Sequence, residues 1–317
     1  MTLQKKLLIL CTFLLFLVLD ACRERDKDGR ILDTPTSGFL EIAIDESLRP
    51  LMDAEVNVFE ALYKHADNKS SYYPEAEAID ALMSDSVRLA VVTRRFTQEE
   101  KDYFKKIKIT PTELDVAISA VALIVHQENP DTLINMDQIK ALLQGKINRW
   151  SELGSKNKAG IEIVFDNPNS GLIRHLKDSV AQVQTLPTNT FAVKNNEAVI
   201  DYVSQNKNAL GLIGLEWISD KDDSVSNSFL ERVKVMSVAG DSTHFKPYQA
   251  YLALKYYPLA RRITMLSREA RKGLASGFMA FVASERGQRI VLKAGLVPVT
   301  MPLRIVEVDR SDFEIEN

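Results

Sequence analysis

Hydrophobic residues recur along this chain with two spacings that alternate from segment to segment. In residues 38–45, which read GFLEIAID, apolar positions alternate with polar or small ones, and this period of two predicts a strand. Residues 46–66 follow with apolar positions three or four apart, which predicts a helix that Asp45 or Ser47 would cap. The chain therefore begins its patterned part with a strand and a helix.

The same exchange continues toward the C-terminus. Further strands are expected at 87–93, 115–126, 160–167 and the second half of 195–218. Further helices are expected at 78–86, 97–107, 170–183, the first half of 195–218 and 268–295, and one within 133–153. Asn135 and Gln138 predict a capping box, and Gly145 is expected to end that helix. The polar stretch 219–229 predicts a mobile surface loop. Such alternation predicts the α/β class with mostly parallel sheets.

The first residues have the features of an export signal. A short basic start, MTLQKK, precedes the apolar run LLILCTFLLFLVL, which is too short and wrongly flanked for a stable membrane span. The run ends in LDAC, and a small residue before Cys22 resembles the bacterial lipoprotein signal, which is cleaved before a cysteine that then carries lipid. An ordinary secretory signal with an incidental cysteine is the alternative. We expect a signal peptide at 1–21 and lipidation of Cys22.

Composition narrows the function classes. The chain holds 40 Lys and Arg against 43 Asp and Glu, a net charge of −3, which gives no sign of a nucleic-acid surface. Cys11 would leave with the signal, so the mature protein would have no disulfide, no cysteine metal site and no cysteine nucleophile. Roughly 295 residues would remain, enough for one large or two medium domains. The mixed-charge segment 22–36 predicts a solvated tether.

Motifs for catalysis or cofactor binding are missing from the sequence. The histidines have no ligand spacing and are read as structural or surface residues: His65, His126, His175 and His244. No P-loop, dinucleotide fingerprint, G-x-S-x-G or metal motif occurs. Ser170 has no base partner evident in the sequence. We expect no enzyme activity, no cofactor and no metal.

Four segments, in order, resemble the substrate-binding proteins of phosphate ABC transporters. Residues 118–154 resemble the family's strand, "NP", helix and "G-K-I-x-x-W-S-E-L-G" entry to the second lobe, and 195–218 resemble its "x-N-E-x-V" helix and glycine-containing strand. The segment YPLARRI and residues 278–299 resemble its return to the first lobe and its C-terminal helix. The resemblance spans about residues 38–303, nearly all of the mature chain.

This resemblance implies an α/β, two-lobe type II periplasmic-binding-protein fold with a hinge and an interlobe cleft. Lobe 1 would comprise 37–116 and 247–304, lobe 2 would comprise 117–246, and 305–317 would be a C-terminal tail. It implies a lipid-anchored solute-binding protein of the bacterial envelope that faces the periplasm. Such a protein, expected to be a monomer, would capture phosphate or a related oxyanion by lobe closure and present it to an ABC permease in the inner membrane.

Two of the family's phosphate loops are altered in lobe 1. Where the family has roughly "G-S-S-T-V-x-P-L", this chain has IDESLRPL: Ser47 keeps the threonine's hydroxyl, while Asp45 and Glu46 replace serines. Where the family has "G-S-G-x-G", this chain has PEAEA, with Glu75 and Glu77. Asp45 as a plain helix cap, and the two glutamates as solvated first-turn acids, are the alternatives.

A third loop, VTRRF, places Thr93 on the family's serine and Arg94 where relatives have Asp or Arg. A hydroxyl beside a guanidinium that can grip an oxyanion in a bidentate way is a good binding pair. Thr93 and Arg94 are therefore expected to line the site, whereas Arg95 is read as a surface charge. We expect Arg94→Ala to abolish phosphate binding.

The fourth loop, DNPNSGL at 166–172, stands where the family has "R-x-x-G-S-G-T". Ser170 and Gly171 match and would offer N–H groups and a hydroxyl at a helix start, and Asn169 precedes them. Asp166 replaces the family's arginine, and Arg174 follows one turn into the helix. With Arg94 as the cation and Asp166 as the acceptor, the two charges would have been exchanged between the lobes.

The acidic loops leave three interpretations open. Five carboxylates, at Asp45, Glu46, Glu75, Glu77 and Asp166, would repel a dianion in a dry cleft unless they are capped, protonated or turned away. The protein binds phosphate despite them, or the same fold binds a different solute, or the protein is a non-transport envelope protein for sensing or interaction with a degenerate cleft.

Overall fold

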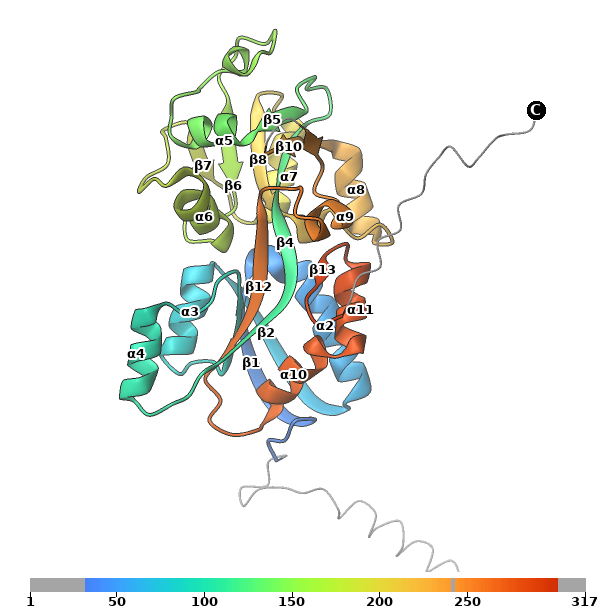
Figure 1. The fold of residues 1–317 in the computed structure, drawn as a ribbon. Coiled ribbons are helices and arrows are strands. Elements are labelled where there is room, and N and C mark those ends of the chain that lie inside the picture. The colour runs from blue at the N-terminus through green and yellow to red at the C-terminus, as the bar shows by residue number, and fades with distance from the viewer. Residues whose placement is uncertain (1–31, 241–242, 302–317) are drawn as a thin grey trace, which may run out of the picture.

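Two long strands, β4 (Thr112–His126) and β12 (Ala260–Ser267), run through the centre of the molecule and connect two α/β lobes (Figure 1). The computed structural model describes residues 32–240 and 243–301. The expected signal peptide, Cys22 and most of the tether precede the described residues, and the expected tail follows them. Within those ranges no helix has the length and apolar character that crossing a membrane requires.

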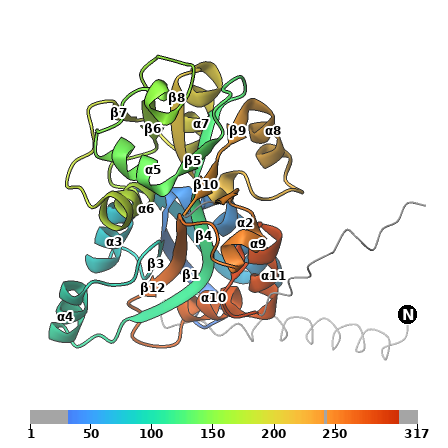
Figure 2. The ribbon, with the colours of Figure 1, turned by 45° about the horizontal axis from the view of Figure 1, so that its top comes forward.

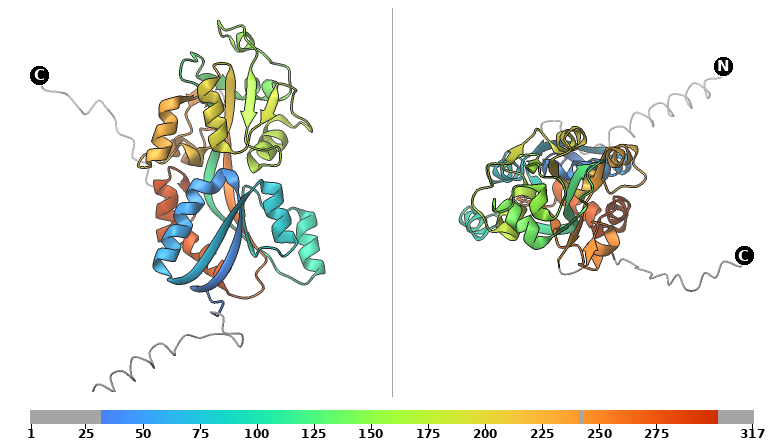
Figure 3. Two further views of the ribbon diagram at one scale, coloured as in Figure 1. Left: turned by 180° about the vertical axis from the view of Figure 1, so that it is seen from behind. Right: turned by 90° about the horizontal axis from the view of Figure 1, so that it is seen from above.

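Lobe 1 is built on one sheet whose strands are ordered β2-β1-β3-β12-β4, with β13 also paired to β4. Helices cover it on two sides, α3 and α4 on one and α2, α10 and α11 on the other (Figures 1 and 3). Its other elements are β1 (Ser37–Asp45), η2 (Glu46–Leu48), α2 (Arg49–Leu62), β2 (His65–Tyr73), α3 (Glu75–Met83), β3 (Leu89–Val92), α4 (Gln98–Lys106), α10 (Leu274–Ala283), α11 (Glu285–Lys293) and β13 (Val297–Pro298).

Lobe 2 continues the sheet from β4 through β8 and β6 to β7, with β9 also on β4 and a small separate sheet β11-β10-β5. Figure 2 shows α5 and α6 on one side of this lobe and α8 on the other. Its elements are β5 (Leu133–Asn135), α5 (Met136–Leu143), η3 (Trp150–Leu153), β6 (Glu162–Phe165), α6 (Gly171–His175), the π-helical turn η4 (Leu176–Ala181), β7 (Thr190–Ala192), α7 (Asn196–Gln205), β8 (Ala209–Gly214), η5 (Leu215–Trp217), α8 (Ser224–Arg232), β9 (Val233–Val235), β10 (Ser237–Ala239) and β11 (His244–Phe245). Helix α9 (Gln249–Ala253) follows, and the side chain of Gln249 donates to the carbonyls of Leu292 and Leu296 in lobe 1.

Strand β4 belongs to both lobes because it changes partners along its length. Ala120 pairs with Ala260 of β12, and the next residue, Val121, pairs with Gly214 of β8. Its apolar side chains from Val116 to Val125 are almost all buried, as expected for a strand covered on both faces. The division of the chain between lobes that the sequence suggested stays a prediction.

The sheets are mixed, so the expectation of mostly parallel sheets was wrong. Strands β1, β2 and β3 run parallel to one another, as do β6, β7 and β8. The crossing strand β12 is antiparallel to β3 and β4, and β4 is antiparallel to β8, β9 and β13. Two segments that cross between the lobes in opposite directions place an antiparallel pair at the centre of the sheet.

Several local predictions are confirmed. Asn135 and Gln138 form the reciprocal capping box of α5, and Gly145 has φ +70° just beyond the helix, a left-handed conformation that glycine adopts without strain. The predicted helix at 170–183 begins with Ser170 as its cap, although it changes to π-helical hydrogen bonding after His175. The strongest periodic signals therefore gave correct elements.

Other local predictions were wrong. Residues 65–73, HADNKSSYY, form β2, a strand that alternation of apolar residues did not reveal because it is a polar edge strand paired with β1 along its whole length. The expected loop at 219–229 contains the start of α8, capped by Asp223. The expected long helix at 268–295 is two helices, since Ser284 between them has extended backbone angles.

Candidate functional site

Four loops meet at the interface between the lobes, where strands end and helices begin. Lobe 1 supplies the turn after β1, the start of α3 and the residue after β3, and lobe 2 supplies the loop from β6 into α6. We call the side chains that meet there the interlobe cluster: Asp45, Ser47, Glu75, Thr93, Asp166, Ser170, Gly171 and Arg174. Most of the site residues predicted from the four loops are thus brought together.

Asp45 is fully buried and joins the two lobes. Its Oδ1 accepts hydrogen bonds from Ser47 N at 2.9 Å and Ser47 Oγ at 2.7 Å, which caps the turn η2. Its Oδ2 accepts a hydrogen bond from the N–H of Gly171, in the other lobe, at 2.9 Å. The capping role anticipated for Asp45 is therefore present, together with a second contact that the sequence did not indicate.

Glu75 is equally buried and makes a matching set of contacts. Its Oε2 accepts hydrogen bonds from Thr93 N at 2.7 Å and Thr93 Oγ1 at 2.6 Å, and its Oε1 pairs with the guanidinium of Arg174 from lobe 2. Arg174 also donates from Nη2 to Thr93 Oγ1 at 3.1 Å and to Thr93 O at 3.3 Å. Glu75 is thus a lobe-bridging ion-pair partner, and the solvated-acid alternative is wrong for this residue.

Gly171 leaves the room that these two carboxylates occupy. A Cβ at this position would lie 2.5 Å from Glu75 Oε2 and 2.6 Å from Asp45 Oδ2, and it would also meet Thr93 Oγ1. These separations are far shorter than carbon–oxygen contacts allow. Only glycine therefore lets lobe 2 approach the two lobe 1 carboxylates this closely.

Asp166 lies at the edge of the cluster and is 2 % exposed. It accepts hydrogen bonds from Ser170 Oγ at 2.8 Å and from Asn196 Nδ2 at 3.3 Å. Asn196 also donates from Nδ2 to Glu46 Oε2 at 2.7 Å, so a single amide joins acids of both lobes. The side chain of Asn169 is exposed, while its carbonyl accepts a hydrogen bond from Ala76 N at 3.2 Å across the interface.

The carboxylates of the cluster differ in their proton affinity. Burial, and then the charge of Glu75, raise the pKa of Asp45. Burial also acts on Glu75, but the Arg174 guanidinium and the Thr93 donors outweigh it and hold the pKa of Glu75 below its ordinary value. Burial, reinforced by Asp45, raises the pKa of Asp166 to about 7. At neutral pH, Glu75 is therefore the most firmly ionised of the three.

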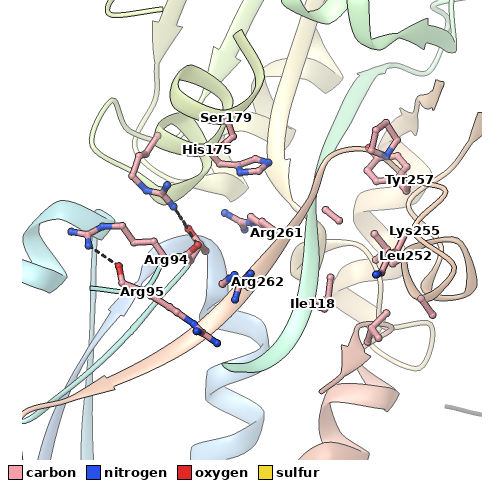
Figure 4. Close-up of a pocket in the computed structure, with 16 residues that line it drawn as sticks. Arg94, Arg95, Ile118, His175, Ser179, Leu252, Lys255, Tyr257, Arg261 and Arg262 are labelled. Carbon is pink, nitrogen blue, oxygen red and sulfur yellow. Dashed lines mark hydrogen bonds between the residues drawn. The ribbon is translucent and has the colours of Figure 1, made fainter. Parts of the chain in front are cut away.

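Arg94, the cation expected from the sequence, is held elsewhere. Its guanidinium binds both carboxylate oxygens of Glu100 on α4, at 2.7 and 2.8 Å, and the carbonyl of Arg95 at 3.0 Å. A bidentate pair of this kind fixes the guanidinium plane, and Figure 4 shows the Arg94 side chain extending away from Arg261 and hydrogen-bonded to the carbonyl of Arg95. A part for Arg94 in ligand binding stays a prediction.

Besides Arg174, the site contains a second cation, Arg261 on β12, which was not predicted from the sequence. Its side chain is buried, and Nη2 donates to Ser47 Oγ at 3.0 Å and lies 3.4 Å from Glu216 Oε2. The sequence signal was present in YPLARRI, because adjacent arginines on a strand point to opposite faces and one of them must face inward. Arg262, its neighbour, is exposed and pairs with Asp115.

A pocket of about 890 Å³ opens beside the cluster (Figure 4). Its cationic lining includes Arg94, Arg95, Arg174, Arg261 and Arg262, with His175 next to them. No group of three or more His, Cys, Asp and Glu side chains is placed to hold a metal ion within residues 32–240 and 243–301. The N–H groups, hydroxyls and guanidinium groups gathered here are donors of the kind that anionic oxygens accept from.

Comparison with known proteins gives a consistent result. Residues 32–286 match the family model described as PBP superfamily domain. The phosphate-binding protein PstS of Pseudomonas aeruginosa is 23% identical over 287 residues, which cover 86% of this chain and 85% of that protein. PstS of Bacillus subtilis is 22% identical over 279 residues, covering 88% and 86%.

Solved structures agree with the fold. A protein of Clostridium perfringens, described as a phosphate ABC transporter substrate-binding protein with bound phosphate, superposes with a TM-score of 0.71 at 24% identity, covering 83% of this chain and all of that one. An ABC-type phosphate transport receptor of Vibrio cholerae gives a TM-score of 0.64 at 18% identity. The resemblance inferred from the four sequence segments, and the two-lobe fold, are confirmed.

Proposed function

This chain belongs to the PBP superfamily, and from that premise we propose that it is the lipid-anchored solute-binding component of a phosphate-type ABC importer. It captures phosphate or a related oxyanion between its lobes, outside the cytoplasmic membrane, and delivers it to a permease. The similarity to PstS proteins supports the solute class and the permease partner. The export signal with Cys22 supports the anchor.

One observation carries this proposal: donors from both lobes converge on anionic oxygens. The N–H and hydroxyl of Ser47, the N–H and hydroxyl of Thr93 and the N–H of Gly171 all donate to carboxylate oxygens. Arg174 and Arg261 flank them. Carboxylate and phosphate oxygens accept hydrogen bonds with the same geometry. The carboxylates of Asp45 and Glu75 therefore stand in the closed protein where oxyanion oxygens would be bound.

Opening of the lobes would release the N–H of Gly171 and the guanidinium of Arg174, which lobe 2 contributes. Polar contacts join the lobes, among them Asp45 with Gly171, Glu75 with Arg174, Glu46 with Asn196, and the indole N–H of Trp217 with the carbonyl of Ser47 at 3.1 Å. Polar interlobe contacts around two connecting strands are typical of hinge-bending binding proteins. In the open form, a phosphate would compete with Asp45 and Glu75 for the same N–H and hydroxyl groups.

The same contacts favour a second candidate, a protein whose cleft is filled by its own acids and which senses or binds another protein. Each of the five donors is satisfied without a ligand. A dianion added beside ionised Glu75 would meet strong repulsion in a dry site. This candidate differs from the first in a measurable way, because it predicts no phosphate binding until the acids are removed.

Isothermal titration of residues 23–317 with phosphate at pH 7 tests the choice. Under the importer proposal, the wild type binds phosphate with a dissociation constant in the micromolar range or tighter. Glu75→Gln, which keeps the shape but removes the charge, then changes affinity without creating the site. If the wild type gives no heat at millimolar phosphate and only Glu75→Gln binds, the cleft is filled by its own acids and the importer proposal fails. Arg289→Lys, at an exposed ion pair on α11, is the matched control.

A further inference from the structure

Arg261 is a buried cation with most of its hydrogen-bonding capacity unused. A guanidinium has five N–H donors, and here only Nη2 makes contacts, with Ser47 and at 3.4 Å with Glu216. Nε and Nη1 have no partner within the described residues, although the residue is only 3% exposed. Burying donors without partners costs free energy, so a ligand that satisfies them is favoured.

His175 presents a second donor to the same place. It is the last residue of α6, and its Nε2 is buried and has no partner in the part of the chain that the structure describes. Burial, and then the charge of Arg261, lower the pKa of His175 to about 4. The imidazole is therefore neutral at pH 7 and can donate one N–H to an anion. Figure 4 shows His175 and Arg261 close together on the same side of β4.

Both residues line the pocket beside the interlobe cluster, and the pocket has two kinds of wall. Arginines line one side, whereas Ile118, Leu252, Tyr257 and Val297 contribute apolar surface where the pocket crosses β4 and β12 (Figure 4). Its volume of about 890 Å³ is within the range of sites for small organic ligands, ~300–1,000 Å³. Inorganic phosphate alone would leave most of this space and its apolar wall unused.

The other arginines of the pocket are already paired. Arg94 binds Glu100, Arg95 and Arg262 bind Asp115, and Arg174 binds Glu75. Lys255 also lines the pocket, but it is exposed and can be hydrated. The unused buried donors of Arg261 and His175 are therefore the groups of this pocket that gain most from an added anion. They adjoin the interlobe cluster through Ser47, which donates to Asp45 and accepts from Arg261.

We infer that this pocket binds an organic phosphate monoester, whose phosphoryl group is held by Arg261 and His175 and whose organic part lies along the apolar wall. This inference rests on the proposed function, because it names the oxyanion that the same interlobe region captures. It keeps the solute class of the proposed function but changes the position of the phosphoryl group, which lies at Arg261 and His175 and not at the Ser47, Thr93 and Gly171 donors that Asp45 and Glu75 occupy. Those carboxylates then remain bound to their donors when the ligand is present.

The test is titration of residues 23–317 with phenyl phosphate, inorganic phosphate and phenol at pH 7. Phenyl phosphate is expected to bind at least 10-fold more tightly than inorganic phosphate, and phenol is not expected to bind. Arg261→Lys keeps one charge but loses the fork, and should weaken phenyl phosphate by about 10- to 100-fold. His175→Phe, which keeps a planar ring but has no N–H, should weaken it by about 2- to 10-fold, as expected for a lost hydrogen bond between neutral donor and anion.

Controls separate the outcomes. Arg289→Lys measures the general effect of the substitution, and thermal unfolding by circular dichroism shows whether each variant is folded. If Arg261→Lys unfolds, His175→Phe alone decides. Tight binding of inorganic phosphate that phenyl phosphate does not displace would overturn the pocket proposal and leave the importer proposal standing. Absence of heat with both anions would reject both proposals.

Discussion

Glu55 offers a test of the electrostatic reasoning in a part of the molecule remote from the cleft loops. It lies on the inner face of α2, is fully buried, and neither carboxylate oxygen has a hydrogen-bond partner among the described residues. Burial raises the pKa of Glu55 to about 9 from an ordinary value of 4.5. The side chain is therefore protonated in the folded protein at neutral pH and ionised in the unfolded chain.

The sign and size of the effect follow from proton linkage. Between pH 4.5 and about 9 the folded state binds a proton that the unfolded state has lost, so the free energy of unfolding falls as pH rises through this window. Each pH unit lowers the free energy of unfolding by about 1.4 kcal/mol, so at pH 7 it is about 3 kcal/mol lower than at pH 4.5. Glu55→Gln keeps the shape of the neutral acid and has no proton to lose.

Urea unfolding followed by circular dichroism at pH 5 and pH 8 measures the difference. Wild type and Glu55→Gln should have similar stability at pH 5, and the variant should be more stable by about 4 kcal/mol at pH 8. Glu231→Gln, an exposed position on α8, is the control and should follow the wild type. Parallel stability curves for wild type and Glu55→Gln would refute the assignment of a neutral buried acid.

Three further predictions concern the site and the anchor. Gly171→Ala should reduce phosphate affinity by at least 100-fold, as measured by titration. The added Cβ would meet the Asp45 and Glu75 oxygens only when the lobes are closed, so thermal unfolding of the separate lobes should change little. The pKa of Asp166 is raised to about 7, so its negative charge appears between pH 6 and pH 8 and should weaken phosphate binding over this range. Asp166→Asn should lose less affinity as pH rises and should bind phosphate about 10-fold more tightly than the wild type at pH 8. Titration of both proteins across the range measures the difference, and equal slopes would contradict it. Cys22→Ser should move the protein from the membrane fraction to the soluble extract of expressing cells, as measured by immunoblotting; an unchanged membrane fraction would argue against lipidation.

The parts of the fold that were predictable are those where one physical signal dominates. Strand β1 shows clean alternation, β4 is a long apolar run, and α5 carries both a capping box and a C-terminal glycine. Strand β2 was not predictable from its own residues, since its polar sequence is fixed as a strand only by pairing with β1. The direction of β12 also depends on its partners, which is why the mixed sheet was not anticipated.

The candidate site divides in a similar way. The four loops were located through the resemblance to the phosphate-binding family. In the structure each follows a strand and precedes a helix, and parallel strands bring such loops to one edge. The pairing within the site could not be read from the sequence. Arg174 is 99 residues from Glu75 and reaches it only across the lobe interface, whereas Arg94 finds Glu100 six residues away. Arg94, which the sequence favoured as the cation of the site, pairs locally with Glu100, and Arg174 from the other lobe pairs with Glu75.

These contacts explain how Asp166 is accommodated at the start of the loop 166–172. In the family pattern an arginine stands at this position, and here Asp166 is held by Ser170 and by Asn196, whose amide also binds Glu46. The positive charge has not been lost from the site, because Arg261 enters it from β12 and Arg174 from α6. Two cations now face acids in both lobes, so the lobe interface holds internal ion pairs and hydrogen bonds. A ligand for such a site must add negative charge where donors are still unused, and those donors are Nε and Nη1 of Arg261 and Nε2 of His175 within the described residues.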